Sequence, residues 1–163
     1  MIVPNFESID HAHYMREALR EAEHALSKGE RPIGAVVVHD GRIVGRGRAQ
    51  HRERRSQIAH AEIIALLDAA HFLDSHAHEG SILYTTLEPC VMCLGAVVMS
   101  DVDAVVFSLS DKRINPANML QIPYVREHIM HYMGGVLEHE SRVLWERFSP
   151  RELRVLTTGE KVL

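Results

Sequence analysis

The sequence contains few of the features that define several protein classes. It has two cysteines in 163 residues, too few for the disulfide framework of a small secreted protein. Its apolar runs are far shorter than the roughly 18 residues that a membrane-spanning helix needs. The first five residues lack the basic start and apolar core of a secretory signal. We therefore expect a cytoplasmic protein with no membrane partner, whose thiols serve metal or redox chemistry.

Repeats, low-complexity tracts and linkers are also missing, so the sequence predicts one domain over residues 1–163. The net charge of -4 disfavours a generic polyanion-binding protein. Residues 41–60 depart from this balance, because they hold six arginines against Glu53 alone, a local net charge of +5. These arginines either belong to a solvated hairpin and loop or contact a phosphate-bearing substrate.

The hydrophobic pattern predicts alternating helices and strands. Apolar residues at spacings of three and four predict helices over 8–28 and 60–72. Runs rich in β-branched residues predict strands at 33–39, 81–86 and 105–107, and Asp40-Gly41 predicts a hairpin turn. The other expected elements are a strand at 42–45, a loop at 46–59, helices at 90–99, 124–133 and 140–148, a short strand at 136–138, and a helix stop at Pro150.

Two short motifs, His60-Ala61-Glu62 and Pro89-Cys90-Val91-Met92-Cys93, carry the candidate chemistry. They supply one imidazole, two thiols and one carboxylate. Zinc held by three protein ligands keeps a fourth position open for water, as catalytic zinc sites do. A neighbouring carboxylate can take the proton of that water and pass it to a leaving group. The motifs therefore predict zinc-hydroxide attack on an electron-poor ring carbon and hydrolytic loss of an amine.

Each part of this pattern has an ordinary alternative. A Cys-x-x-Cys pair alone is also typical of a redox site. A closed structural zinc site would need a fourth ligand. The histidines nearest in sequence that could supply it are His51, His71, His76 and His78. If the motifs did not form one catalytic site, each of them would need a separate ordinary explanation. Their occurrence together therefore favours the catalytic interpretation.

Three segments resemble the cytidine/deoxycytidylate deaminase superfamily, namely residues 31–38, 59–63 and 83–96. Within it they are similar to the branch of tRNA adenosine deaminases and bacterial guanine deaminases. The likeness covers residues 8–110 and implies an α/β fold, a three-layer α/β/α sandwich with a five-stranded mixed sheet. It also implies a homodimer with one zinc ion per subunit. The implied ligands are His60, Cys90 and Cys93, with Glu62 as the proton shuttle.

The resemblance also indicates substrate contacts. It implies contacts from Ile33 and from the backbone N–H of Ala61. The family's base-contacting asparagine aligns with Ala49, and the following Gln50 offers an amide instead. From about residue 110 the chain diverges from the RNA-contacting part of the tRNA enzymes. We therefore expect a small heterocyclic substrate such as a nucleobase or nucleoside, with tRNA-specific adenosine deamination (adenosine to inosine) as the alternative.

Three aromatic residues of the divergent part have two interpretations. Tyr124, Tyr132 and Phe148 either close over a planar base as a lid or pack in the core. Aromatic residues at helical spacing more often belong to the core.

Overall fold

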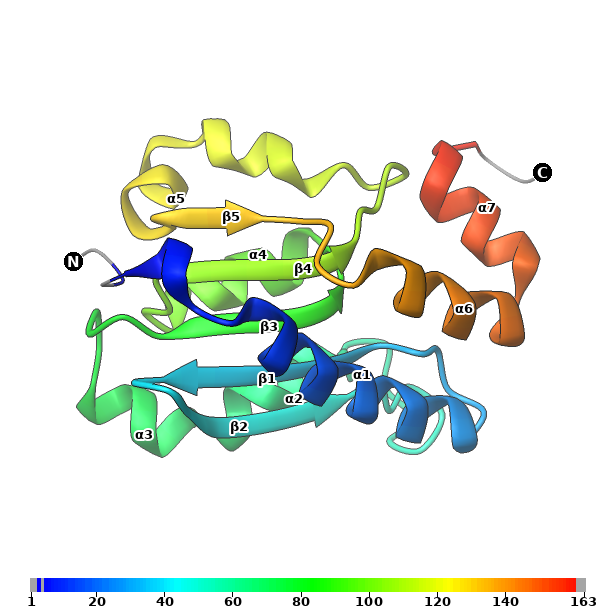
Figure 1. The fold of residues 1–163 in the computed structure, drawn as a ribbon, viewed down its shortest axis with the longest axis horizontal. Coiled ribbons are helices and arrows are strands. Elements are labelled where there is room, and N and C mark those ends of the chain that lie inside the picture. The colour runs from blue at the N-terminus through cyan, green and yellow to red at the C-terminus, as the bar shows by residue number, and fades with distance from the viewer. Residues whose placement is uncertain (1–2, 4, 161–163) are drawn as a thin grey trace.

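The computed structural model describes residue 3 and residues 5–160. At its centre is a five-stranded mixed sheet with the strand order β2-β1-β3-β4-β5 (Figure 1). β1 pairs antiparallel with both of its neighbours, whereas β3, β4 and β5 are parallel to one another. This confirms the predicted five-stranded mixed sheet. The strands are β1 (Gly34–His39), β2 (Arg42–Arg48), β3 (Ile82–Leu87), β4 (Ala104–Leu109) and β5 (His131–Met133).

Helices cover both faces of the sheet and complete the predicted three layers. The helix α1 (His11–Ser27) crosses one face, whereas α2 (Ala61–Asp68) and α4 (Val91–Met99) lie on the opposite face (Figure 1). Successive strand residues point to opposite faces and fill two separate hydrophobic clusters. The remaining helices are α3 (Ala70–Ser75), α5 (Pro123–His128), α6 (Glu138–Phe148) and α7 (Pro150–Thr158), with 3-10 turns η1 (Phe6–Ser8) and η2 (Pro116–Gln121).

Three strand glycines, Gly34, Gly45 and Gly47, let helices approach the sheet unusually closely. A Cβ atom on Gly34 would lie 2.1 Å from the backbone oxygen of Ala18 in α1. A Cβ atom on Gly47 would lie 2.2 Å from the backbone oxygen of Ala61 in α2. A glycine inside a strand marks this kind of close backbone approach. Because Gly47 contacts the first turn of α2, it fixes where that helix begins relative to the sheet.

The topology brings the starts of α2 and α4 to one edge of the sheet. β2 and β3 are both antiparallel to β1 and therefore run in the same direction. The chain leaves each of them at the same edge, where α2 and α4 then begin. The two strands are not direct neighbours, because β1 lies between them. Open α/β sheets bind their ligands at the carboxyl ends of strands.

The predicted elements of the first 110 residues agree with the structure except at their boundaries. The helix expected over 8–28 begins at His11, where the carboxylate of Asp10 accepts the backbone N–H of His13. β2 continues to Arg48, into the segment expected to be a loop. The helix expected over 60–72 is divided at Ala69 into α2 and α3. The sequence there contains neither glycine nor proline, so its pattern gives no sign of the break.

Two predictions in the carboxyl-terminal part were wrong, and a third was incomplete. The helix expected over 124–133 ends at His128, because the next residues pair with β4 as the strand β5. Residues 136–138 are all described, and none of them is in a strand; α6 begins there instead. The helix expected over 140–148 ends at Phe148, before Pro150, as predicted, but Pro150 also begins a further helix, α7. The Ser149 hydroxyl accepts the N–H of Glu152 there, so Ser-Pro-x-Glu is a helix start.

None of the helices in the described ranges is both long and apolar enough to cross a bilayer. Residues 1, 2 and 4, which contributed to the expectation about a secretory signal, lie outside the described residues.

Candidate active site

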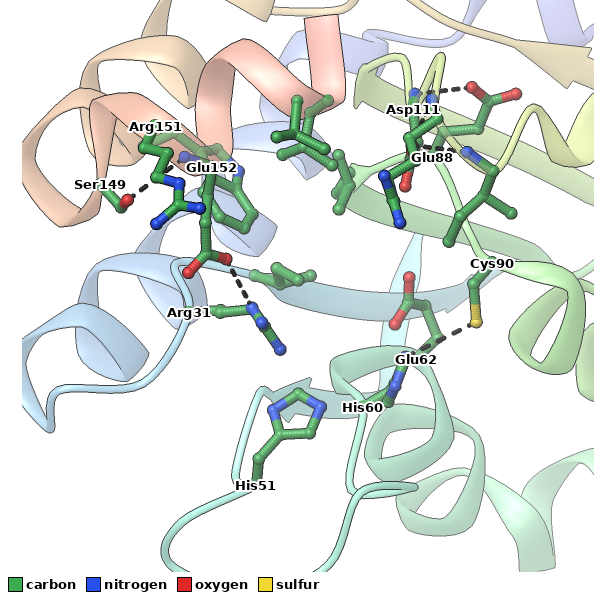
Figure 2. A pocket seen from close by; sticks show the side chains of 17 residues that line it. Arg31, His51, His60, Glu62, Glu88, Cys90, Asp111, Ser149, Arg151 and Glu152 are labelled. Carbon is green, nitrogen blue, oxygen red and sulfur yellow. Dashed lines mark hydrogen bonds and ion pairs between the residues drawn. The ribbon is translucent and has the colours of Figure 1, made fainter. Parts of the chain in front are cut away.

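The two sequence motifs meet at the amino-terminal ends of two helices. His60 is the residue that precedes α2, and Cys90 is the residue that precedes α4. Both have extended backbone conformations, and neither side chain caps its own helix. Cys93 lies in the first turn of α4. The side chains of His60 and Cys90 therefore make no capping hydrogen bond. Together with Cys93 they converge on one point between the two helices (Figure 2 labels His60 and Cys90).

The distances between these side chains fit a zinc ion. His60 Nδ1 lies 3.6 Å from Cys90 Sγ and 3.4 Å from Cys93 Sγ. Tetrahedral zinc, with Zn–N of about 2.0 Å and Zn–S of about 2.3 Å, separates a nitrogen and a sulfur ligand by about 3.6 Å. The metal-binding cluster found here among the described residues contains these three ligands and no fourth. This arrangement favours the open catalytic site over the closed structural one.

The thiol chemistry also favours metal binding. Hydrogen bonding from Cys93, together with the neighbouring His60, lowers the pKa of the Cys90 thiol to about 4. The thiolate is the form of cysteine that binds metals. Both cysteines are free rather than joined in a disulfide. One of the two sulfurs is therefore ready to act as a ligand at neutral pH.

Glu62 lies beside this cluster without belonging to it. Its side chain is 3% exposed, and its Oε1 accepts a hydrogen bond from the Thr85 hydroxyl at 3.2 Å. Its Oε2 lies 3.6 Å from Cys93 Sγ. Burial raises the pKa of the Glu62 carboxyl above its ordinary value. A raised pKa suits a general acid–base, which must both accept and release a proton during the reaction.

A cleft of about 590 Å³ opens over His60, Glu62 and Cys90 (Figure 2). One wall comes from residues before β1, including Ile33, and another comes from α7. These two walls are joined by Arg31, whose Nε donates to Glu152 Oε2 at 2.9 Å. The sequence pattern did not identify α7 as part of the site, although the helix-start signal Ser-Pro-x-Glu was visible. Further lining residues include His51, Asp111, Arg113, Trp145, Arg151 and Leu156.

Glu88 links the cleft to the carboxyl-terminal part of the fold. It is 7% exposed, and its Oε2 accepts the backbone N–H of Asp111 at 2.9 Å. Its Oε1 accepts the hydroxyl of Tyr132 at 2.8 Å. Burial, together with the Glu88 carboxylate, raises the pKa of the Tyr132 hydroxyl. Glu88 and Asp111 line the cleft, and sequence reasoning gave neither a role.

None of the three proposed lid aromatics lines the described cleft. Tyr132 is bonded to Glu88, and Tyr124 is 52% exposed at the surface of α5. Phe148 packs edge-to-face against Trp145, with ring centroids 5.8 Å apart. Trp145 is instead the aromatic side chain that borders the cleft.

Of the four residues expected to contact the substrate, one lines the described cleft and three do not. Ile33 lines the cleft. Ala49 and Ala61 are fully buried, and Gln50 Oε1 accepts a hydrogen bond from Arg54 Nε at 2.7 Å. None of these three side chains is part of the described cleft lining. The substrate contacts therefore stay predictions, as does a contact through the backbone N–H of Ala61.

Of the four histidines considered as a fourth zinc ligand, one lines the described cleft and three do not. The ring of His51 lies edge-on to His60, with centroids 4.9 Å apart, and lines the cleft. His51 Nδ1 lies 3.9 Å from a Glu30 carboxylate oxygen. The other three candidates, His71, His76 and His78, are absent from the described cleft lining and from the three-ligand cluster.

Comparisons with known proteins give one consistent result. The family model of the cytidine and deoxycytidylate deaminase zinc-binding region matches residues 8–109. The tRNA-specific adenosine deaminase of Bacillus subtilis is 42% identical over 144 residues, covering 86% of this chain and 89% of the relative. The enzyme of the same name from Aquifex aeolicus is 37% identical over 140 residues, covering 83% and 92%.

Solved structures show the same fold. A structure from a study of A-to-I editing by tRNA:A34 deaminases superposes with a TM-score of 0.72 at 33% identity. It covers 81% of this chain and 98% of the other. A structure of the guanine deaminase from Nitrosomonas europaea superposes with a TM-score of 0.70 at 22% identity, covering 91% and 85%. At that lower identity the second likeness supports the fold alone.

Proposed function

Because the chain belongs to the cytidine and deoxycytidylate deaminase family and is a hydrolytic deaminase, we propose that it removes an exocyclic amine from a free nucleobase or nucleoside. The observation that carries this substrate class is the cleft itself. Its volume of about 590 Å³ is in the range of small-molecule sites, which are about 300–1,000 Å³. Its wall includes α7 and the Arg31–Glu152 ion pair.

The residues of the site divide the reaction between them. We propose that His60, Cys90 and Cys93 hold one zinc ion per subunit. When bound there, zinc polarises a water molecule and lowers its pKa toward neutrality. Glu62 would take a proton from the attacking water molecule, whose oxygen bonds to the ring carbon. Glu62 would then give that proton to the departing amine, so that ammonia leaves and the carboxylate is restored. The Thr85 hydroxyl holds the Glu62 carboxylate in place.

The arginine-rich segment supports the small substrate as well. Arg46 is paired with Glu17 at 2.8 Å and with Glu21 at 3.4 Å. Arg48 is paired with Glu53 at 2.8 Å. These guanidinium groups are already neutralised by carboxylates of the same chain. Two of the six arginines of residues 41–60 are therefore less available to an RNA backbone.

A second candidate is deamination of adenosine in a tRNA loop. It is favoured by the 42% and 37% identity to proteins named for that activity. The other four arginines of the same segment, Arg42, Arg52, Arg54 and Arg55, form no ion pair within the described part of the chain. These exposed side chains could contact phosphates.

Ammonia release would separate the two candidates. The substrates are cytosine, guanine, adenine, their nucleosides and a tRNA anticodon stem-loop, each assayed at low and at high salt. We expect turnover of a base or nucleoside with a kcat/KM that changes little with salt. An RNA substrate would lose affinity steeply as salt rises, because bound phosphates release counterions. Turnover of the stem-loop alone would replace our proposal by the second candidate.

We also propose that the protein is a homodimer that associates through α2 and α4. These helices expose Leu67 (66%) and Met99 (73%), which border one surface hollow. Exposed apolar residues that cluster in this way often mark an interface. Light scattering should give twice the mass of one chain, and Leu67→Glu should give a monomer. A wild-type monomer at micromolar concentration would exclude this assembly.

A further inference from the structure

A second group of metal-binding side chains lies at the opposite end of the sheet from the cleft. His78, Asp101 and His128 each come shortly before one of the three parallel strands, β3, β4 and β5. The cleft, by contrast, lies where β3 ends and α4 begins. In Figure 1 the loop before β3 and the helix α5 both lie at the left of the view, away from α6 and α7.

The three side chains are close enough to share one ion. His78 Nε2 lies 3.1 Å from Asp101 Oδ1. One ligand atom from each of the three residues lies within 4.8 Å of the other two. The rings of His78 and His128 have centroids 5.6 Å apart. His78 is exposed, and Asp101 and His128 are half-buried, so the side chains are open to an ion from solvent.

His128 carries the hydrogen bond that metal-binding histidines usually have. Its Nδ1 lies 2.8 Å from the carbonyl oxygen of Tyr124. A carbonyl oxygen can only accept, so Nδ1 carries the proton and Nε2 keeps its lone pair. Bound histidines commonly donate their other ring N–H to such an acceptor, which fixes the tautomer. The neutral imidazole is thus held in a form that can bind a metal.

The backbone segments that carry these residues are tied together by Asp103. Its side chain is 1% exposed, and its Oδ2 accepts the N–H groups of Gly80 at 2.8 Å and Ser81 at 3.2 Å. Its backbone oxygen accepts the N–H of Met130 at 2.8 Å. The loops before β3, β4 and β5 are therefore held together by one residue, Asp103, through its buried carboxylate and its backbone oxygen. A site needs this kind of support to keep its ligands in place.

We propose that His78, Asp101 and His128 form a surface site for a divalent transition metal ion, of the class of Zn²⁺ or Ni²⁺. Two imidazoles and one carboxylate suit these ions, and their remaining coordination positions face solvent. The bound ion joins the starts of the three parallel strands. The site is independent of the deaminase site, because it shares no residue with the cleft. The competing explanation is a simple ion pair between His78 and Asp101, whose side chains are 48% and 39% exposed.

The test uses untagged, full-length enzyme that already carries zinc at its catalytic site. Equilibrium dialysis against Ni²⁺, followed by elemental analysis of both metals, counts nickel and retained zinc per chain. We expect one nickel per chain above the retained zinc, with unchanged deaminase activity. Thermal unfolding gives a second readout, because an ion that binds only the folded state raises Tm.

The variants are chosen to keep the backbone intact. His78 and Asp101 both have left-handed backbone conformations, with φ of 58° and 56°. Asparagine adopts this conformation readily, so His78→Asn and Asp101→Asn remove a ligand without adding strain. His128→Gln does the same at the end of α5. Each change should weaken nickel binding by about 100-fold or more, since loss of an outer-sphere partner alone costs about 10- to 100-fold.

The matched control is His24→Gln, which removes an exposed histidine of α1 outside the cluster. It should keep the nickel stoichiometry and the Tm shift of the wild type. The proposal is overturned if the wild type binds no nickel beyond exchange with zinc. It is equally overturned if His78→Asn and His128→Gln bind nickel as the wild type does. Either result leaves the deaminase proposal unaffected.

Discussion

The two ends of the sheet place the side chains of the two proposed metal sites in different ways. At the carboxyl end, His60 and Cys90 are the residues at which helices α2 and α4 begin, and Cys93 is fully buried. At the amino end, His78 and Asp101 lie in loops and are 48% and 39% exposed. Helix starts packed on a sheet place ligands rigidly beside a cleft. Loops tied by Asp103, through its carboxylate and its backbone oxygen, place them at the surface, where an ion can exchange.

The largest expected effect concerns the buried end. Glu62→Gln keeps the size of the side chain and can keep the contact with Thr85, but it removes the group that accepts the proton. General acid–base catalysis contributes about 10²- to 10⁴-fold, so kcat should fall by at least that factor. Zinc content and the unfolding midpoint should stay close to those of the wild type. Steady-state kinetics with elemental analysis measures both.

A loss of zinc in Glu62→Gln would contradict this role, because it would make Glu62 a ligand or a support of the ligands. Thr85→Val is the companion variant, since it removes only the hydrogen bond to Glu62. It should lower kcat less than Glu62→Gln does.

The next effect tests whether backbone contact with the sheet positions the site. Gly47→Ala adds a Cβ atom that would lie 2.2 Å from the backbone oxygen of Ala61. Overpacking costs about 1–3 kcal/mol, and backbone atoms cannot rotate away, so we expect about 3 kcal/mol of lost stability. The start of α2 must shift, so kcat should fall as well. Urea unfolding and kinetics on the same sample measure the two effects.

Gly95→Ala is the matched control for this substitution. A Cβ atom there meets nothing within 4 Å in the same chain, and Gly95 lies inside α4. Alanine is favoured over glycine inside a helix by about 1 kcal/mol. Stability should therefore stay equal or rise. Equal destabilisation by both alanines would show that close packing at Gly47 is not the cause.

A smaller effect is expected at the amino end. Asp103→Ala leaves the N–H groups of Gly80 and Ser81 without their acceptor. An unsatisfied buried group costs about 1–3 kcal/mol, so the free energy of unfolding should fall by about 2 kcal/mol. Because the cleft is at the other end of the sheet, kcat should be unchanged once the protein is folded. A large fall in kcat would show that the two ends are coupled.

The smallest effect concerns Glu17 and Arg46, which join α1 to β2. The hydrogen bond from Arg46 lowers the pKa of the Glu17 carboxyl below its ordinary value. This contribution to stability is present above the unfolded pKa and is lost as pH falls through the folded one. Arg46 is 42% exposed, so the contribution should stay below about 1 kcal/mol.

The measurement for this pair is the difference in free energy of unfolding between wild type and Glu17→Gln. The difference should be present at pH 7 and should shrink toward pH 3. Glu7→Gln, at an exposed position without an ion pair among the described residues, should show no such difference. A difference that is independent of pH would mean that packing, not charge, explains the effect.

Prediction from sequence succeeded where local pattern and local chemistry agree. The β-branched runs and the Asp40-Gly41 turn predicted β1 and its hairpin with β2. It failed where a distant partner decides the local structure. Residues 131–133 have the composition of a continuing helix and form β5 only because β4 offers an edge for parallel pairing. The sequence of residues 41–60 likewise indicates unpaired positive charge. In the structure, Glu17 and Glu21, which are distant in sequence, pair with Arg46.

The sequence by itself determined the ligand types and most of the helices and strands, because these depend on residue identity and on periodicity along the chain. The family and the three-layer fold followed from the resemblance of its motifs to known deaminases. Only the tertiary structure decided that α7 borders the cleft. It also decided that His78, Asp101 and His128 lie together, outside the lining of the cleft. The reason is physical. Which residues from separate segments come within bonding distance depends on strand order, register and close packing, and none of these is a property of a single stretch of sequence.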